Sequence, residues 1–379
     1  MKNTLIIILT AIVLGGCATS TPKMNNETLP ENESLSDSAS VEEQLETVFY
    51  PMPPNQPRLQ FLATLSAEDQ LKSGIFPLKA RGFLQIKRPY GIGAVKGKIY
   101  ISDRKFNKIL VVDLQKKHVD VIAGPYESAG IWVTEEDHKY IADFNQKQII
   151  VLDSNSRVIK VYTEPDLFDK PVDVAVFQNR IYVCDLNKHM VFVIDKDSGK
   201  NIQAIGGIGT EEGKLYKPTH VIVDRGGNLY VNDFFNLRVQ KFDSEGNFLQ
   251  SFGQPGDNLG AFARPKGIGI DRDGHLYAVD AAFENVQIFD DSTTDLLLFF
   301  GEFGLDPGNM YMPNALYIDY DNVEYFREYA DKNFDLQYLV YVGNTWGPVR
   351  FNVYGFGNWT GPPLKEAESK SDGNNEIAK

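Results

Sequence analysis

Short apolar runs separated by polar turns dominate the chain between residues 58 and 360. The runs are rich in Val, Ile, Tyr and Phe, and the turns between them hold Gly, Asp or Asn. Such runs are typical of β-strands, and consecutive runs joined by tight turns form antiparallel hairpins. An aromatic content of 12%, with 24 Phe and 18 Tyr, also favours strands over helices.

The runs recur as a repeated unit. Its clearest copies are residues 217–253 and residues 264–290, which begin 47 positions apart. A Tyr-x-x-Asp marker recurs in five copies, at intervals of 40, 42, 48 and 47 residues. Its aspartates are Asp103, Asp143, Asp185, Asp233 and Asp280. A sixth, divergent copy ends at Asn344 and is delayed by an insertion over residues 322–335.

Each copy holds four runs, which predicts a four-stranded antiparallel meander. Units of this length with four strands are typical of propeller blades. A single meander has two apolar faces that it cannot bury alone, whereas a ring of blades buries both. The sequence therefore predicts an all-β, six-bladed β-propeller over residues 58–360. We assign the repeat Asp to fold maintenance, because a turn Asp hydrogen-bonds the backbone that follows it.

The repeat pattern Gly-Asn-Leu-Tyr-Val-x-Asp followed by Asn-x-Arg-Val-Gln-Lys-Phe-Asp resembles the NHL-repeat family of six-bladed propellers. The resemblance extends over about residues 88–303. Residues 50–62 also resemble the lead-in of bacterial NHL-repeat lipoproteins. That resemblance implies that residues 58–65 pair beside residues 350–355 in the last blade and close the ring.

The N-terminus has the pattern of a targeting signal. Lys2 precedes an apolar stretch over residues 5–14 that is too short to span a bilayer. The following Leu-Gly-Gly-Cys, ending at Cys17, resembles the lipobox of bacterial lipoproteins; the alternative is an ordinary secretory signal with a chance cysteine. We therefore expect a signal peptide over residues 1–16 and lipidation of Cys17. Because Ala18 is not the Asp that retains such proteins in the inner membrane, we expect an outer-membrane location in the bacterial envelope.

The segment after Cys17 is acidic and poor in aromatic residues. Seven acidic residues and one lysine give residues 18–49 a charge of −6, out of −13 for the whole chain. Such a segment buries too little apolar surface to fold, so residues 17–57 are predicted to be a disordered acidic and Pro-rich tether. Residues 361–379 are predicted to be a disordered tail. The net charge also argues against a nucleic-acid partner.

Propellers place their binding and active sites at the mouth of the axial channel, near the start of each innermost strand. The position two residues after the repeat proline is occupied by Gly91, Asp173, His220, Gly267 and Ala315, and its match in the second blade, which lacks that proline, is Gly130. Only Asp173 and His220 can act as ligands, and they lie on adjacent blades. They hold water or, as the alternative, a divalent cation, although a metal site prefers three or more such groups. We expect no other cofactor.

Enzyme signatures are not apparent in this sequence. Peptidyl-amidoglycolate lyases resemble NHL propellers but rely on several zinc-binding histidines. Of the five histidines here, only His220 lies at the channel mouth, and the other four lie at turns, just before strands or in a loop. Gluconolactonase-type propellers use a carboxylate-rich calcium site, which has no matching acidic constellation. The sequence has no Cys-x-x-Cys-His for covalent haem and no Gly-x-Ser-x-Gly elbow. We assign no catalytic residue.

The insertion in the last blade carries aromatic residues and an arginine at near-helical spacing, at Tyr325, Phe326, Arg327 and Tyr329. It is read either as a short helix packed on the rim or as an interaction surface, since Tyr and Arg are enriched at interfaces.

The predicted function is a non-catalytic, lipid-anchored propeller that binds a protein or peptide partner as a scaffold in the bacterial envelope. Bacterial relatives of this type can accompany multihaem cytochromes, so the resemblance extends the partner class to envelope electron-transfer proteins. The alternative is a metal-dependent hydrolase or lyase at the channel mouth.

Overall fold

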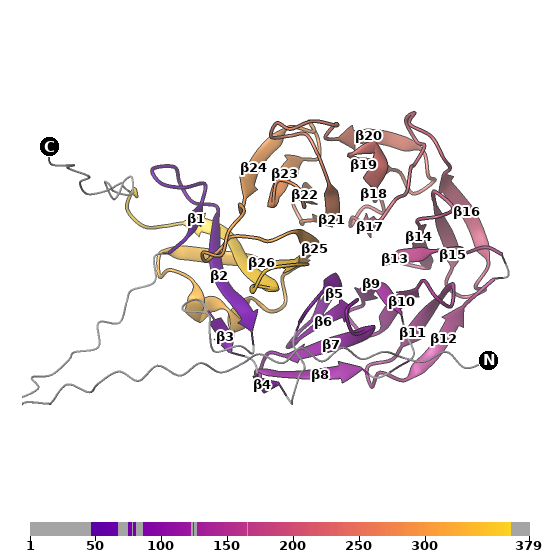
Figure 1. The fold of residues 1–379 in the computed structure, drawn as a ribbon, viewed down its shortest axis with the longest axis horizontal. Coiled ribbons are helices and arrows are strands. Elements are labelled where there is room, and N and C mark those ends of the chain that lie inside the picture. The colour runs from indigo at the N-terminus through magenta and orange to yellow at the C-terminus, as the bar shows by residue number, and fades with distance from the viewer. Residues whose placement is uncertain are drawn as a thin grey trace, which may run out of the picture. The chain divides into compact units, whose positions relative to one another are not determined.

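The computed structural model describes residues 47–66, 75–77, 79–80, 86–122, 124, 127–164 and 166–364. These residues form six sheets arranged around a central axis, with one strand of each sheet lying nearest the axis (Figure 1). The prediction of an all-β, six-bladed propeller is confirmed. The signal peptide, Cys17, most of the tether and residues 365–379 lie outside the described residues. Within the described part of the chain, no helix is long and apolar enough to cross a membrane.

Five blades are antiparallel sheets whose strands follow the sequence from the axis outwards (Figure 1). Blade one holds β5 (Pro89–Val95), β6 (Lys98–Asp103), β7 (Lys108–Asp113) and β8 (His118–Ile122). Blade two holds β9 (Ser128–Val133), β10 (Lys139–Asp143), β11 (Gln148–Leu152) and β12 (Val158–Tyr162). Blade three holds β13 (Pro171–Phe177), β14 (Arg180–Asp185), β15 (Met190–Asp195) and β16 (Asn201–Gly206).

Blades four and five are the two most regular copies of the repeat. Blade four holds β17 (His220–Val223), β18 (Leu229–Asp233), the 3-10 turn η1 (Phe234–Asn236), β19 (Arg238–Phe242) and β20 (Phe248–Phe252). Blade five holds β21 (Pro265–Ile270), β22 (His275–Asp280), β23 (Asn285–Asp290) and β24 (Leu296–Phe300).

Blade six is built from both ends of the propeller. It holds β25 (Pro313–Asp319), η2 (Val323–Tyr325), η3 (Arg327–Tyr329), β26 (Phe334–Asn344), β27 (Phe351–Trp359), β2 (Leu59–Ser66) and β1 (Phe49–Tyr50). Strand β2 pairs antiparallel with β27, with Leu59 opposite Phe356. This confirms the predicted closing strand, which joins the two ends of the ring by backbone hydrogen bonds. Two further short strands, β3 (Ile75–Pro77) and β4 (Lys79–Ala80), pair in parallel with β2 and β8.

The propeller begins earlier than the sequence predicts. Strand β1 lies inside the segment assigned to the disordered tether, yet it pairs with β2. Phe49 is buried, with its ring 5.3 Å from that of Trp359 and 6.1 Å from that of Phe334. The prediction was wrong for residues 47–57 because these aromatic contacts come from distant parts of the chain.

The core lies between the blades, where facing sheets bury their apolar side chains. Between blades one and two, for example, Ile109 and Tyr100 pack with Ile131, Ile141 and Ile150. Burying each such side chain stabilises the fold by about 1.5–3 kcal/mol. Each blade packs against only two neighbours. Hydrogen bonds between adjacent blades and within their turns add to this apolar packing.

The repeat Asp supplies one set of these contacts, at the end of the ring where the innermost strands begin. Asp280 accepts hydrogen bonds from four backbone N–H groups, two in the turn after it and two in the segment that leads into β21. Asp103 and Asp185 bind the corresponding segments of blades one and three. We call this the Asp end of the ring. The structural role assigned to the repeat Asp is therefore observed directly.

The repeat Tyr binds at the opposite end, which we call the Tyr end. Tyr100 of blade one donates to Asp137 of blade two at 2.7 Å, and Tyr230 of blade four donates to Asp291 of blade five at 2.7 Å. The Tyr277 and Tyr338 hydroxyls join blades five and six at 2.8 Å. The Tyr-x-x-Asp marker thus ties blades one, three and five at the Asp end, and its tyrosines link blade one to two, four to five and five to six at the Tyr end.

Candidate functional site

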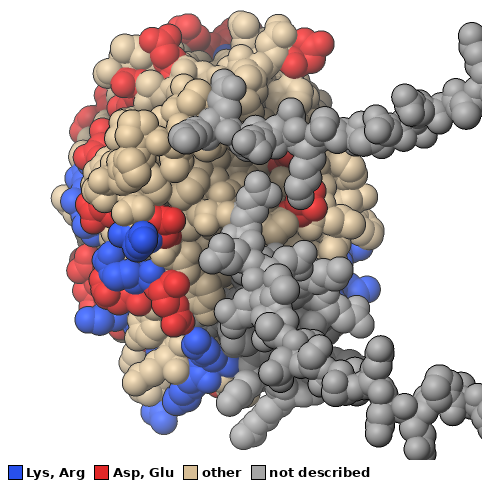
Figure 2. Space-filling model, turned by 90° about the vertical axis from the view of Figure 1, so that its left-hand side faces the viewer, with Lys and Arg blue, Asp and Glu red and all other residues tan. Residues whose placement is uncertain are grey.

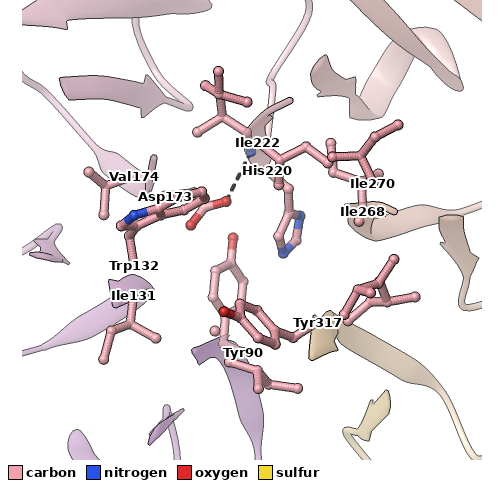
Figure 3. A pocket seen from close by; sticks show the side chains of 17 residues that line it. Tyr90, Ile131, Trp132, Asp173, Val174, His220, Ile222, Ile268, Ile270 and Tyr317 are labelled. Carbon is pink, nitrogen blue, oxygen red and sulfur yellow. Dashed lines mark hydrogen bonds between the residues drawn. The ribbon is translucent and has the colours of Figure 1, made fainter. Parts of the chain in front are cut away.

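The innermost strands surround a cavity of about 170 Å³ on the axis. Most of its lining is aliphatic, from isoleucine, leucine and valine side chains of all six blades. Three polar side chains interrupt this lining near the strand starts: Tyr90 on β5, Asp173 on β13 and His220 on β17 (Figure 3). The two residues selected from the sequence therefore line one cavity, together with a tyrosine that sequence reasoning did not select.

Asp173 is held between two neighbouring blades. Its Oδ2 accepts a hydrogen bond from the backbone N–H of Val221 at 2.9 Å (Figure 3). A Cβ atom on Gly130 of blade two would lie 1.8 Å from Asp173 Oδ1, so only glycine leaves room for the carboxyl group. Burial raises the pKa of Asp173 to about 7, although the hydrogen bonds from the N–H groups of Val221 and Val174 act in the opposite direction.

His220 is buried at the same level of the cavity. Its ring stacks on that of Tyr90 at 5.1 Å, and its Nδ1 lies 3.1 Å from Thr219 Oγ1. Burial lowers the pKa of His220 to about 3, and the cations Lys266 and Arg104 add to this effect. The imidazole is therefore neutral at physiological pH. Its Nε2 has no hydrogen-bond partner among the described residues.

The geometry gives no complete metal site in the described part of the chain. No group of three His, Cys, Asp or Glu side chains there is placed to hold a metal ion. Asp173 and His220 supply two groups, and Cys184, which is buried and free, has a pKa raised well above its usual range. A divalent cation at Asp173 and His220 stays a prediction.

A set of cations and aromatic side chains lies at the Asp end, at four of the six junctions between blades. Arg88 lies over Trp346 at 5.1 Å, and Lys266 lies over Phe234 at 4.1 Å. Arg104 lies over both Tyr90 at 5.0 Å and Phe144 at 5.4 Å, and Lys170 covers Phe144 at 5.9 Å. We call this set the cation–aromatic ring. Its contacts join blade six to one, one to two, two to three and four to five.

Within the described residues, none of the four cations of this ring forms an ion pair with a carboxylate. Burial and the neighbouring Arg264 and Arg104 lower the pKa of Lys266 to about 8. On the side of the propeller that blade six presents, Figure 2 shows Lys and Arg intermingled with Asp and Glu. Carboxylates at the Asp end form other contacts. The repeat aspartates accept hydrogen bonds from backbone N–H groups, and Asp169 forms an ion pair with Lys147 at 2.9 Å.

Sequence reasoning missed the cation–aromatic ring because its members do not occupy one repeat position. A signal was nevertheless present. Arg104, Phe144 and Phe234 each follow a marker Asp, and the other cations flank a repeat proline or its equivalent. Both repeat positions, after the marker Asp and beside the repeat proline, lie at the Asp end. Comparing the charges of the residues at these two positions would therefore have predicted a cationic mouth.

The insertion predicted as a helix or an interaction surface forms the two 3-10 turns η2 and η3. Phe326 is fully buried, with its ring 6.3 Å from that of Tyr341. Tyr325 and Tyr329 pack partly against the same core cluster, and the exposed Arg327 is paired with Glu324 at 2.8 Å. These contacts fit the interpretation of the insertion as an element that packs on the rim of blade six. An interaction surface on these four residues stays a prediction.

The fold and the site define a six-bladed propeller with a polar-ended channel and a cationic mouth. Residues 132–251 match a family described as 6-bladed beta-propeller. A probable peptidyl-alpha-hydroxyglycine alpha-amidating lyase of Caenorhabditis elegans is 30% identical over 118 residues, which span 30% of this chain and 33% of that protein.

Two solved structures illustrate the similarity of fold. An auxiliary nutrient binding protein from Bacteroides thetaiotaomicron has a TM-score of 0.59 at 11% identity, covering 80% of this chain and 78% of its own. A streptogramin B lyase has a TM-score of 0.51 at 14% identity, covering 71% and 93%. Likeness at this level of identity extends to the propeller fold and not to activity.

Proposed function

We propose that this chain is a non-catalytic, lipid-anchored binding module of the bacterial envelope, whose Asp end binds an acidic segment of a protein or peptide partner. The single observation that carries the proposal is the cation–aromatic ring. Within the described residues, four cations at the Asp end have no carboxylate partner, in a chain whose net charge is −13. Unpaired cations of this kind attract an acidic surface and raise its rate of association.

The exposed side chains around the ring support a protein or peptide as the partner. Trp346, Phe235 and Tyr216 are 46%, 57% and 39% exposed at the Asp end. Tyr216 stacks between His189 and Phe235 at ring distances of 5.3 and 5.2 Å, which holds these large side chains in place. Rigid aromatic residues next to arginine are the composition of protein interfaces. The lipid on Cys17 and the acidic tether complete the proposal by holding the domain at the outer membrane.

Binding of acidic peptides to the full-length chain tests the Asp end. We expect a fluorescent peptide of alternating Asp, Glu and Phe to bind, and its affinity to fall with added salt. In an Arg88→Glu, Lys170→Glu double variant the affinity should fall by about 100-fold, because two attractive charges become repulsive. A Lys96→Glu, Lys200→Glu double variant changes the same charge at exposed positions away from the ring and serves as the control. Equal affinities of both double variants would refute the proposal.

The anchor and the partner require measurements in cells. We expect a Cys17→Ala chain to be released from the membrane fraction, and membrane retention equal to wild type would contradict the anchor. Crosslinking in intact envelopes, followed by affinity purification, should recover a partner from wild type and lose it from the Arg88→Glu, Lys170→Glu variant. Envelope electron-transfer proteins would be recognised among the captured proteins by their haem absorbance.

A metal-dependent hydrolase or lyase is the second candidate, favoured by the 30% identity to an amidating lyase over part of the chain. Elemental analysis of the purified full-length chain separates the two candidates. Stoichiometric Zn or Ca that is lost from an Asp173→Ala, His220→Ala variant would favour the enzyme. A metal-free chain that binds acidic peptides would favour the binding module.

A further inference from the structure

The channel itself is a second site, which lies next to the cation–aromatic ring and shares Tyr90 with it. It is closed at the Asp end, because the Tyr90 hydroxyl reaches across from blade one to donate to the Thr219 carbonyl of blade four at 3.2 Å. Tyr90, Asp173 and His220 are each less than a tenth exposed. Toward the Tyr end, by contrast, the lining side chains, Trp132, Ile222, Ile270 and Tyr317, are half-buried. These exposures indicate an apolar pocket that is more open at the Tyr end. Its polar side chains, Tyr90, Asp173 and His220, converge as Figure 3 shows.

A chain of hydrogen bonds supports one tautomer of His220. The side-chain amide of Asn232 donates to Thr219 Oγ1 at 2.8 Å and also to the carbonyls of Pro265 and Lys266, which fixes its orientation. We assign the Thr219 hydroxyl as the donor to His220 Nδ1, because it has no other acceptor among the described residues. With that assignment the one proton of the neutral imidazole lies on Nε2. Nε2–H is then a buried donor without a partner among the described residues, on a ring that projects into the cavity (Figure 3).

The charges around the floor favour an anionic acceptor for this donor. Arg104 and Lys266 both act on His220, and neither is paired with a carboxylate among the described residues. Asp173 is the opposing group, but its raised pKa allows it to be protonated at small cost near neutral pH. The nearby Cys184 stays a neutral thiol because its pKa is raised. The floor therefore has a positive potential whenever Asp173 is protonated.

We propose that the channel binds a small organic carboxylate, whose carboxylate group accepts the hydrogen bond of His220 Nε2–H and whose compact apolar body lies among the aliphatic side chains of β17, β21 and β25. A cavity of about 150 Å³ lined by aliphatic and aromatic side chains holds a benzene molecule. The 170 Å³ available here fits a phenyl or branched alkyl group of that size. An unpaired buried donor is costly, and a ligand that pairs it gains that energy.

Calorimetric titration of the full-length chain in non-ionic detergent tests the carboxylate. Phenylacetate and 3-methylbutanoate are the probes, and the corresponding amides are matched neutral controls of equal size. We expect each acid to bind at least about tenfold more tightly than its amide, because a charge-assisted hydrogen bond is about twice as strong as a neutral one. Amides that bind as tightly as the acids, or acids that do not bind, would overturn the proposal.

Variants test the floor. A His220→Phe change keeps a ring to stack on Tyr90 but removes the donor, and it should weaken phenylacetate binding by about tenfold or more. His138→Phe, at a partly buried histidine of the β9–β10 turn, is the control and should bind as wild type. Imidazole ¹H–¹⁵N spectra of the wild-type chain report the tautomer of His220 directly, and the His220→Phe variant serves only to identify which signal belongs to His220. We expect the Nε2–H tautomer, and we expect its proton signal to shift when the chain is saturated with phenylacetate. An Nδ1–H tautomer would refute the proposed donor.

Two sources could supply such a carboxylate, a free small acid or the C-terminus of a polypeptide. A pentapeptide ending in Leu, with a free or an amidated C-terminus, distinguishes them in competition with phenylacetate. Displacement by the free peptide alone supports a polypeptide C-terminus, and displacement by neither supports a free acid. The channel shares Arg104 and Lys266 with the cation–aromatic ring, but neither is changed in the Arg88→Glu, Lys170→Glu variant. That variant should therefore bind phenylacetate as wild type even if it loses the acidic peptide.

Discussion

At the Tyr end of the ring, lysines are paired with the carboxylates that link neighbouring blades. Lys98 and Lys139 both contact Asp137, at 3.0 and 3.1 Å, and Lys241 contacts Asp291. At the Asp end, the cations around the channel lie over aromatic rings instead, without a carboxylate partner among the described residues. The Asp end also has ion pairs within the fold, Lys147 with Asp169 and Arg238 with Asp233. The difference is that the four cations of the cation–aromatic ring stay available for a partner, whereas the lysines named at the Tyr end stabilise the fold.

The buried polar groups follow the same division. Asp271, near the Tyr end, accepts from Tyr338 at 2.9 Å and lies 2.8 Å from His275 Nδ1, so its carboxylate is used within the fold. Near the Asp end, His220 Nε2 has no hydrogen-bond partner and Asp173 forms no ion pair among the described residues, although the Tyr182 hydroxyl near the Tyr end is also unpaired there. Unpaired polar groups reduce stability, and two of them facing one cavity support a ligand site. The following predictions test this difference, from the largest expected effect to the smallest.

Removing a repeat Asp should have the largest effect on stability. Asp280→Ala leaves four backbone donors without their acceptor, so we expect the free energy of unfolding to fall by about 3 kcal/mol. Urea denaturation of the full-length chain measures it. The control is Asp257→Ala, an exposed position where the change should stay below about 0.5 kcal/mol. Equal losses in both variants would mean that the repeat Asp is not a structural tie.

The two buried groups of the channel should give opposite pH dependences. The folded pKa of Asp173 is raised to about 7, so its contribution is present at low pH and is lost as pH rises from 4 to 7. The folded pKa of His220 is lowered to about 3, so stability falls as pH drops from 6.5 to 3.

Wild-type stability should therefore vary little between pH 4.5 and 7, because the two contributions offset each other. An Asp173→Asn variant should gain stability as pH rises over this range, and a His220→Phe variant should lose it, each on the order of 2 kcal/mol. Urea denaturation at the two pH values measures both. Parallel pH profiles in the two variants would contradict the assigned pKa directions.

Two lysines at opposite ends should respond differently to the same substitution. Lys241→Met leaves Asp291 without its cation, so we expect a loss of about 2 kcal/mol. Lys266→Met removes a partly buried, unpaired charge along with its contact to Phe234, and these effects should offset to within about 0.5 kcal/mol. Thermal unfolding of both variants provides the measurement. A larger loss in Lys266→Met would place that lysine among the structural residues.

The smallest contrast concerns two repeat tyrosines. Tyr230→Phe removes the hydrogen bond to Asp291 between blades four and five, and should cost about 1 kcal/mol. The Tyr182 hydroxyl is buried without a hydrogen-bond partner among the described residues, so Tyr182→Phe should be neutral or slightly stabilising. Chemical denaturation resolves the difference. A substantial cost in Tyr182→Phe would indicate a bound water at that hydroxyl.

The sequence by itself determined the fold, because the propeller is a repeat of local structure. Turn residues after each strand and the spacing of the Tyr-x-x-Asp marker specify a four-stranded blade, and only a ring buries both faces of such blades. The same regularity identified Asp173 and His220 as candidate ligands, because the equivalent positions of the other blades hold glycine or alanine. The closing strand followed from resemblance to known lipoproteins and is confirmed by the pairing of β2 with β27.

Only the tertiary structure decided which charges meet. Arg88 and Trp346 are brought together by closure of the ring, and no local pattern encodes their contact. The burial of Phe49 and Phe326 likewise depends on side chains distant in the sequence. A repeat specifies each blade through short-range hydrogen bonds, whereas the chemistry at the axis arises from six different segments that converge on one point.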